Sequence, residues 1–423
     1  MALKKAPRRE HYDRLETRPP KAREAALMLA LPKLIGHAKK RAPGFAKILS
    51  HVRAEKITSR AALAGLPVTR KSDLGALQAA LRPLGGLNAT PVEKLAKLFM
   101  SPGPIYEPEG RGEDWWRTAR ALFAGGFRAG DLVVNTFAYH FTPAGSMLES
   151  GARALGCTAV PTGVGQTELQ VAAIRDLGVT GYIGTPSFLK LIVEKADEMK
   201  ADITSLAKAH VGAEYLPPAL RQAMRDRGIR VAQSYGSADL GSIAYESMLP
   251  DGSVCEGMIL DEGLLLEIVR PGTGDPVPAG EVGEVVITTL NRDYPLVRFG
   301  TGDLSAILPG ASPCGRTNTR IRGWMGRADQ STKVRAMFVT PKQVSEIARR
   351  HAEVRKARLV VEGEAGNDRM TLKCEVADKS PNLVEAIVAT IREVTKLRGE
   401  VELVAPGTLP NDGKVIDDLR KYG

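Results

Sequence analysis

The most informative stretch of this 423-residue chain is GTLPNDGK at residues 407–414, which ends on a single lysine, Lys414. Glycine, proline, asparagine and aspartate favour turns, so the stretch predicts a loop that presents the lysine ammonium. Three segments upstream share one chemical theme, because each sets a carboxylate among glycines or small polar residues. They are SYGSAD at 234–239, RFGTGD at 298–303 and GRAD at 326–329.

In this order and spacing, the four segments resemble the adenylate-forming superfamily of acyl-CoA synthetases, and within it the phenylacetate-CoA ligase branch. The resemblance runs from about Pro67 to the end of the chain. It implies an α/β fold in two domains. Residues 1–325 would form a large N-terminal adenylate-forming domain of mostly parallel sheets with helices and a smaller β-subdomain, and residues 326–423 a small, mobile α+β C-terminal cap domain.

The resemblance also implies an activity. The chain would be an AMP-forming ligase that joins a carboxylic acid, an aryl acid in this branch, to coenzyme A through an acyl-adenylate. ATP and coenzyme A would be co-substrates and Mg²⁺ the cofactor. Such a site must hold a polyanion next to a carboxylate, so it needs a metal ion, backbone N–H groups and at least one lysine to offset the repulsion.

Length and composition agree with a folded protein of two or more domains, because single cores stop growing near ~250–300 residues. Hydrophobic residues make up 43% of the chain and charged residues 25%, which is ordinary for a globular protein. No stretch approaches the ~18 uninterrupted apolar residues of a membrane helix. The basic N-terminus leads into no apolar run. We therefore expect a cytoplasmic protein with no membrane partner.

The net charge of +11 predicts attraction to polyanions, a class that includes nucleic acid as well as ATP and coenzyme A. The basic residues are scattered and aromatic residues make up 5% of the chain, which disfavours a stacking groove for single strands. The expected partners are therefore the small-molecule acid, ATP and coenzyme A, without nucleic acid. A homodimer is left open.

Hydrophobic patterning divides the chain into four regions. The first hundred residues have a helical distribution of Ala and Leu. From Asp131, short apolar runs alternate with helical stretches, which is typical of a parallel sheet covered by helices. Residues 263–307 contain closely spaced strands separated by Gly-Pro turns, which predict a smaller second sheet. The last region predicts a compact α+β domain, with helices at 341–351 and 382–396 and strands at 357–362 and 370–376.

Within the resemblance, Asp303 corresponds to the aspartate that accepts hydrogen bonds from the ribose hydroxyls, a role suited to a carboxylate with several lone pairs. Asp239 stands where most relatives have the glutamate that holds Mg²⁺, and it is one methylene shorter. Taken alone, Asp303 is ordinarily a solvated turn aspartate at a strand end; the neighbouring strand and Arg298 favour the functional interpretation. The remaining predicted nucleotide contacts are Gly212, Ala213, Glu214, Ser234, Tyr235, Gly236, Ser237 and Arg327.

The resemblance gives the C-terminal region two further roles. Asp329 would be the hinge about which the cap domain turns between two half-reactions. Lys414 would be the catalytic lysine, a compact point charge that bridges the acid carboxylate and the α-phosphate. A lone lysine after glycine is ordinarily a solvated loop residue, and only the segments around it reverse that interpretation.

Tyr139, His140 and Phe141 fall where this branch lines its acyl pocket, and aromatic rings with an imidazole suit a flat aryl acid. Core packing is an equally good interpretation of Phe141 and of the neighbouring Phe137. A hydrogen-bonded structural histidine is the commoner interpretation of any single His.

The chain departs from the family in the loop at 101–110, SPGPIYEPEG, where relatives carry a Ser, Thr and Gly-rich loop with a lysine for the β- and γ-phosphates. Three prolines remove N–H donors, and Glu107 and Glu109 add negative charge. The alternative function is therefore a degenerate member that binds nucleotide or acyl-AMP without full ligase activity. Cys255 and Cys314 lack the further ligands of a tetrahedral site, so we predict no zinc there.

Overall fold

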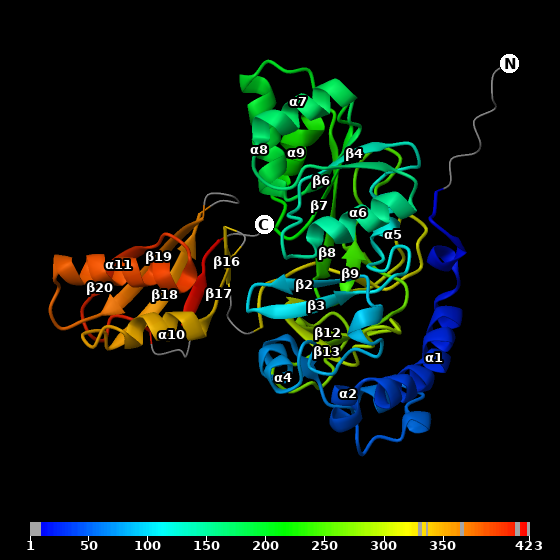
Figure 1. Ribbon diagram of the computed structural model, residues 1–423, viewed down its shortest axis with the longest axis horizontal. Helices are drawn as coiled ribbons and strands as arrows, with labels where there is room; N and C mark the ends of the chain where they lie inside the picture. Colours follow the sequence, from blue (N-terminus) through cyan, green and yellow to red (C-terminus); the bar gives the residue numbers. More distant parts are fainter. Residues whose placement is uncertain (1–9, 329–331, 336, 364–367, 411–414, 421–423) are drawn as a thin grey trace. The chain divides into compact units, whose positions relative to one another are not determined.

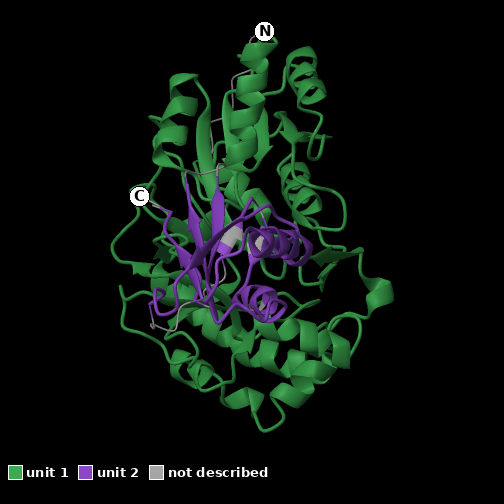
Figure 2. Ribbon diagram, turned by 90° about the vertical axis from the view of Figure 1, so that its left-hand side faces the viewer, with its two compact units in different colours: residues 1–326 green, residues 327–423 purple. Residues whose placement is uncertain are grey.

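The computed structural model describes residues 10–328, 332–335, 337–363, 368–410 and 415–420. By its internal contacts the chain divides into two compact units, Met1–Gly326 and Arg327–Gly423 (Figure 2). Each unit has a hydrophobic core of its own. The sheets and helices given below confirm the predicted α/β class.

Helices dominate the first eighty residues, as the Ala and Leu pattern predicts (Figure 1). Helix α1 buries Leu27, Leu31, Ile35 and Ala38, a spacing of three to four residues that places them on one face. Proline at the first helical position starts the helix without losing a hydrogen bond. The helices of this region are α1 (Pro20–Arg41), α2 (Pro43–Ile48), α3 (Arg60–Ala64) and α4 (Leu74–Ala80).

A nine-stranded sheet forms the centre of the first unit, in the order β14-β15-β10-β9-β8-β7-β6-β4-β5. The five strands from β8 to β5 are parallel, and β9 joins β8 antiparallel. The strands are β4 (Leu132–Asn135), β5 (Thr158–Pro161), β6 (Gly181–Gly184), β7 (Lys208–Val211), β8 (Arg230–Ser237), β9 (Gly241–Tyr245), β10 (Met258–Leu260), β14 (Ile307–Leu308) and β15 (Arg320–Ile321).

Helices cover both faces of the parallel part, because successive strand residues point to opposite sides. On β4, Val134 packs into a core with α7 (Thr167–Leu177), α8 (Pro186–Glu198) and α9 (Pro218–Asp226). Its neighbour Val133 packs into a separate core with α5 (Thr118–Ala124) and α6 (Ala144–Ala154). Buried on both sides, these strands read as continuous apolar runs in the sequence.

The smaller predicted sheet is present as four strands in the order β1-β13-β12-β11. It packs against α1 and α2 in the largest hydrophobic core of the unit. Strand β1 pairs with β13 in parallel, with Arg70 opposite Gly300. The strands are β1 (Thr69–Arg70), β11 (Leu264–Val269), β12 (Gly283–Thr289) and β13 (Phe299–Ser305), and a separate hairpin joins β2 (Lys97–Ser101) to β3 (Ile105–Glu109).

The second unit contains the two helices and two strands predicted for it. Its sheet has the order β20-β19-β18-β21 and packs against both helices. Thr340 and Gln343 form a reciprocal cap at the start of α10, which fixes that helix end. The elements are the β16 (Thr332–Val334) and β17 (Met337–Val339) hairpin, α10 (Pro341–Arg349), β18 (Lys356–Glu362), β19 (Arg369–Glu375), α11 (Pro381–Thr395), β20 (Glu400–Val404) and β21 (Ile416–Asp418).

Within the described parts of the chain, every helix is too short or too polar to span a bilayer.

Candidate active site

Two predicted nucleotide residues from different sheets meet directly. The Tyr235 hydroxyl, at the end of β8, donates a hydrogen bond of 2.8 Å to Asp303 Oδ2 on β13. The Trp324 indole N–H lies 3.1 Å from the other carboxylate oxygen, Oδ1. The Asp303 carboxylate is therefore held in a fixed orientation by two aromatic donors while it remains half-buried.

The predicted metal ligand, Asp239, lies in the turn between β8 and β9, and its side chain is fully buried. Lys71, which directly follows β1, donates from Nζ to Asp239 Oδ2 at 2.6 Å. Asp239 Oδ1 is buried and has no hydrogen-bond partner among the described residues. One oxygen of this carboxylate is thus paired with an ammonium, and the other has an unused lone pair.

Glu107 on β3 is the third acidic residue of this cluster and is fully buried. Burial, together with the charge of Asp239, raises the pKa of Glu107 to about 7, against the lowering effect of Ser101 and Lys71. Burial lowers the pKa of Lys71, but Asp239, Glu107 and Asp303 outweigh it and leave the pKa above its ordinary value. Lys71 is therefore a charged ammonium among several carboxyl groups at neutral pH.

The altered segment 101–110 spans the last residue of β2, the turn of the β2–β3 hairpin and all of β3. Glu107 folds back over the turn and accepts hydrogen bonds from the Ser101 hydroxyl and, at 3.2 Å, from the Ser101 N–H. The Tyr106 N–H donates to Gln78 Oε1 at 2.9 Å. Three donors of this segment, the Ser101 hydroxyl and the Ser101 and Tyr106 N–H groups, are thus used inside the protein.

Gly212, Ala213 and Glu214 follow β7 and lie beside the end of β8. Ala213 has a positive φ of 65° and is exposed. A Cβ atom at Gly212 would lie 3.4 Å from the carbonyl oxygen of Ser234, so the predicted segments 212–214 and 234–237 are neighbours. Glu214 accepts from the Ser187 N–H at 3.3 Å and, through its carbonyl, from the Gln233 side chain at 2.7 Å.

Ser234 and Ser237 lie at the end of β8 with Tyr235 and the exposed Gly236. The Ser234 hydroxyl lies 2.9 Å from His210 Nε2, and Ser237 Oγ accepts from the Leu240 N–H at 3.2 Å. Burial lowers the pKa of His210 to about 4, so this imidazole is neutral at physiological pH.

The three residues predicted for the acyl pocket differ in exposure. Tyr139 is half-buried and its hydroxyl accepts from the Asn135 amide at 2.9 Å. His140 is exposed, and Phe141 is 72% exposed in a left-handed conformation with φ 59°. The neighbouring Phe137 is instead buried in the core beneath β4. A pocket formed by all three residues stays a prediction.

The other predicted residues belong to the end of the chain. Arg327 is the first residue of the second unit. Asp329 and Lys414 lie outside the described residues, so their roles also stay predictions.

Residues 114–291 match the family model described as AMP-binding enzyme. A phenylacetate-coenzyme A ligase of Aromatoleum evansii is 33% identical over 81% of this chain and 79% of its own length. A phenylacetate-coenzyme A ligase of Thermus thermophilus is 30% identical over 96% of this chain and 99% of its own length. The chain belongs to the phenylacetate-CoA ligase family.

The fold agrees with that membership. The crystal structure of a 2-hydroxyisobutyryl-CoA ligase, in complex with 2-HIB-AMP and CoA in its thioesterification state, superposes with a TM-score of 0.81. The match covers 97% of this chain and 92% of the other at 23% identity. The family and the fold expected from the quoted segments are therefore confirmed.

Asp239 suits the Mg²⁺ that the family implies. Mg²⁺ at nucleotide sites takes one or two carboxylates and completes its shell with phosphate and water oxygens. The unpartnered, buried Oδ1 of Asp239 offers one such ligand. No cluster of three or more His, Cys, Asp or Glu side chains with metal-binding geometry occurs within the part of the chain that the structure describes. The absence of zinc at Cys255 and Cys314 stays a prediction.

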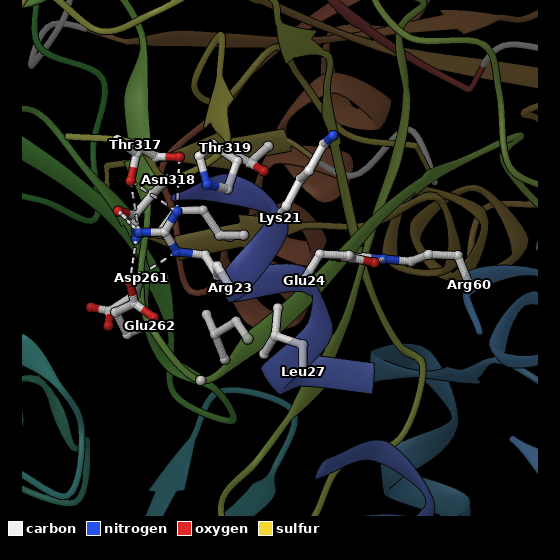
Figure 3. Close-up of a pocket in the computed structure, with 14 residues that line it drawn as sticks. Lys21, Arg23, Glu24, Leu27, Arg60, Asp261, Glu262, Thr317, Asn318 and Thr319 are labelled. Atoms are coloured by element: carbon white, nitrogen blue, oxygen red, sulfur yellow. Dashed lines mark hydrogen bonds and ion pairs between the residues drawn. The ribbon is translucent and has the colours of Figure 1, made fainter. Parts of the chain in front are cut away.

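A separate polar cavity of about 310 Å³ lies beside α1, lined in part by residues 260–264 and 317–319 (Figure 3). Arg23 crosses it to Glu262 at 3.1 Å and to Asn318 at 2.9 Å. Arg60 pairs with Glu24 at 2.8 Å. The Arg23–Glu262 pair anchors α1 to the residues that follow β10, and none of the predicted nucleotide residues lines the cavity, so it is separate from the candidate active site.

Sequence reasoning missed Lys71 and Trp324. Lys71 lies 168 positions from Asp239 in the sequence, and the stretch around it reads as a turn before a capped helix. The signal that could have found it is a lysine directly after a short apolar-polar strand, but only the pairing of β1 with β13 brings that strand to the site.

Proposed function

We propose that this protein is an AMP-forming acid–CoA ligase that activates an aryl acid as its acyl-adenylate and transfers the acyl group to coenzyme A. The observation that carries the proposal is the Tyr235–Asp303 hydrogen bond, which joins β8 of the nine-stranded sheet to β13 of the four-stranded sheet. Family membership supports the chemistry, and the names of its relatives support phenylacetate or a similar arylacetic acid as the substrate.

In this proposal Asp303 accepts hydrogen bonds from the two ribose hydroxyls. Tyr235 and Trp324 hold the carboxylate in the orientation in which it would meet the sugar. The exposed backbone at Ala213 and Gly236 and the half-buried Glu214, Ser234 and Ser237 form the adenine and α-phosphate contacts. A fixed acceptor of this kind lowers the entropic cost of orienting the nucleotide.

Asp239 would hold the Mg²⁺ ion through Oδ1. When bound, the ion supplies positive charge that neutralises the triphosphate during adenylation. The shorter aspartate side chain keeps its orientation because Lys71 holds the other oxygen at 2.6 Å. For Arg327, the hinge residue Asp329 and the catalytic Lys414, the family resemblance supports the proposal. Lys414 would neutralise the acid carboxylate as it attacks the α-phosphate.

The test is AMP release from ATP, Mg²⁺ and coenzyme A with a panel of aryl acids. We expect AMP and the acyl-CoA thioester to form in equal amounts with at least one arylacetic acid. Measurable nucleotide binding without AMP release for every acid would instead indicate the degenerate form. Binding to DNA that weakens as salt rises and does not change when nucleotide is added would indicate a nucleic-acid-binding protein.

Lys414→Ala separates the two half-reactions. It should abolish acyl-adenylate formation while transfer from preformed acyl-AMP to coenzyme A continues. Lys379→Ala is the matched control, because Lys379 is an exposed lysine of the same unit. Equal loss of both half-reactions in Lys414→Ala would contradict the proposed role.

A further inference from the structure

The hairpin at 101–110 lacks the usual means of binding phosphate. Pro102, Pro104 and Pro108 have no N–H. The Ser101 N–H and hydroxyl both donate to Glu107, which is fully buried. A triphosphate at this hairpin would meet a buried carboxyl group and few available donors. If ATP is a substrate, its phosphates need another cation or donor set.

Lys71 is a cation already placed at this site. Its Nζ lies 2.6 Å from Asp239 Oδ2, and the side chain is 26% exposed whereas that of Asp239 is fully buried. A lysine ammonium has three N–H donors, and within the described ranges the Lys71 ammonium has one hydrogen-bond partner, Asp239 Oδ2. Two donors therefore remain on an ammonium that Asp239 holds in place.

The position of Lys71 fits the phosphates better than the adenine. Lys71 interacts electrostatically with Glu107 and Asp303 as well as with Asp239. Lys71 directly follows β1, whose partner strand β13 carries the predicted ribose acceptor Asp303, and its Nζ is held by the predicted metal ligand Asp239. Asp239 Oδ1 stays available for a metal while Oδ2 orients the ammonium.

We propose that Lys71 is the phosphate-binding cation of the first unit and contacts the β- and γ-phosphates of ATP in place of the 101–110 hairpin. Asp239 acts as its positioning residue. The inference rests on the proposed function, because it assumes that the nucleotide occupies the Asp303 site. The Lys71 ammonium would supply the positive charge that the altered hairpin lacks.

The rival explanation is that Lys71 only neutralises the buried Asp239. A lysine with that role alone would support the fold of the site and affect all nucleotides alike. A lysine that contacts the β- and γ-phosphates would discriminate ATP from AMP, because AMP lacks both groups. The ratio of the two affinities therefore separates the explanations.

The experiment compares Lys71→Met, Lys71→Gln and Lys71→Arg with the wild-type protein. Calorimetry measures binding of a non-hydrolysable ATP analogue and of AMP, with and without Mg²⁺. In Lys71→Met and Lys71→Gln we expect the affinity for the ATP analogue to fall at least tenfold while the affinity for AMP changes less than about threefold. Lys71→Arg should keep most of the discrimination, since it keeps the charge.

Lys33→Met is the matched control, because Lys33 is an exposed lysine of α1. Thermal unfolding of each variant identifies any that fails to fold, and two neutral variants are included so that one can replace the other. A parallel loss of both affinities, or no loss of either, would overturn the inference. Binding is measured without an acid, so selective loss in a protein inactive with every acid would refute the proposed ligase activity and leave the Lys71 assignment standing.

Discussion

Asp303 is the residue on which the nucleotide assignment rests. Its carboxylate is oriented by Tyr235 at 2.8 Å and Trp324 at 3.1 Å. Asp303→Asn keeps the volume but removes the charge and turns one acceptor into a donor that faces these groups. A hydrogen bond to a charged group contributes about 1.5–3 kcal/mol, so we expect AMP affinity to fall roughly tenfold to a hundredfold.

Calorimetric AMP binding measures this change. Asp202→Asn is the control, because Asp202 lies in an exposed turn where it caps Thr204. Unchanged AMP affinity in Asp303→Asn would remove Asp303 from the nucleotide site.

His210 makes stability depend on pH in a defined direction. Its pKa is about 4 in the folded state because the ring is buried, against about 6.5 in an unfolded chain. Between these values the unfolded state binds more protons, so the free energy of unfolding falls as pH falls. We expect His210 to account for about 2 kcal/mol of the stability lost between pH 7 and pH 5.

Chemical denaturation of His210→Gln at both pH values measures this contribution. The glutamine amide can still bond to Ser234 Oγ, and the variant should lose less stability on acidification than the wild type. His51→Gln, at an exposed position, should keep the wild-type pH dependence. Equal acid sensitivity of His210→Gln and wild type would contradict the argument.

Among the individual site residues, those that lie in short local motifs can be predicted from the sequence. Tyr235, Asp239 and Asp303 are recognisable because each sits among glycines and small residues in a short segment. Lys71 and Trp324 are not, since their roles come from partners 168 and 21 positions away. The exposure of Phe141 was equally out of reach, because it follows from a left-handed backbone conformation.

At the scale of the elements, helices α5 and α6 pack closely against each other at Gly151, which has no side chain. A Cβ atom at Gly151 of α6 would overlap Thr118 Oγ1 and lie 2.6 Å from the backbone nitrogen of Ala119. Backbone cannot move aside cheaply, so Gly151→Ala should separate the two helices and destabilise the protein by about 1–3 kcal/mol.

Thermal or chemical unfolding measures the effect. Gly75→Ala in α4 is the matched control, because a Cβ atom there meets no atom within 4 Å. It should be neutral or stabilise the protein by up to about 1 kcal/mol through helix propensity. Equal stability of the two variants would contradict the packing argument.

The elements with a strong period were predictable, and those that depend on distant pairing were not. The alternation from β4 to β8 and the α10-β18-β19-α11 order follow from local apolar patterns. The two-residue strand β1 and the three-residue strand β21 are too short to show a period. Each exists because it pairs in parallel with a strand elsewhere in the chain, β13 and β18 respectively.

At the scale of the whole molecule, the two units have separate cores. All predicted nucleotide contacts except Arg327 lie in Met1–Gly326. A protein shortened to residues 1–326 should therefore fold and bind AMP with an affinity within about tenfold of the full chain, because it loses one predicted contact, and tenfold in affinity is about 1.4 kcal/mol, near the contribution of one hydrogen bond to a charged group. It should form no acyl-adenylate, because it lacks Lys414.

Circular dichroism and calorimetry with AMP test this expectation. A fragment that does not fold, or that folds and does not bind AMP, would contradict it. The second outcome would show that the second unit contributes to the nucleotide site. The mobility of that unit, the oligomeric state and the cytoplasmic location stay predictions from the sequence.

The central claim is that this chain forms an acyl-adenylate at the site of Asp303 and Asp239. Exchange of labelled pyrophosphate into ATP, measured with Mg²⁺ and without coenzyme A, tests it most directly because only the first half-reaction is required. We predict exchange that depends on an arylacetic acid and is lost in Asp303→Ala and Lys414→Ala. Absence of exchange with every acid of the panel, in a protein that still binds AMP, would contradict the claim.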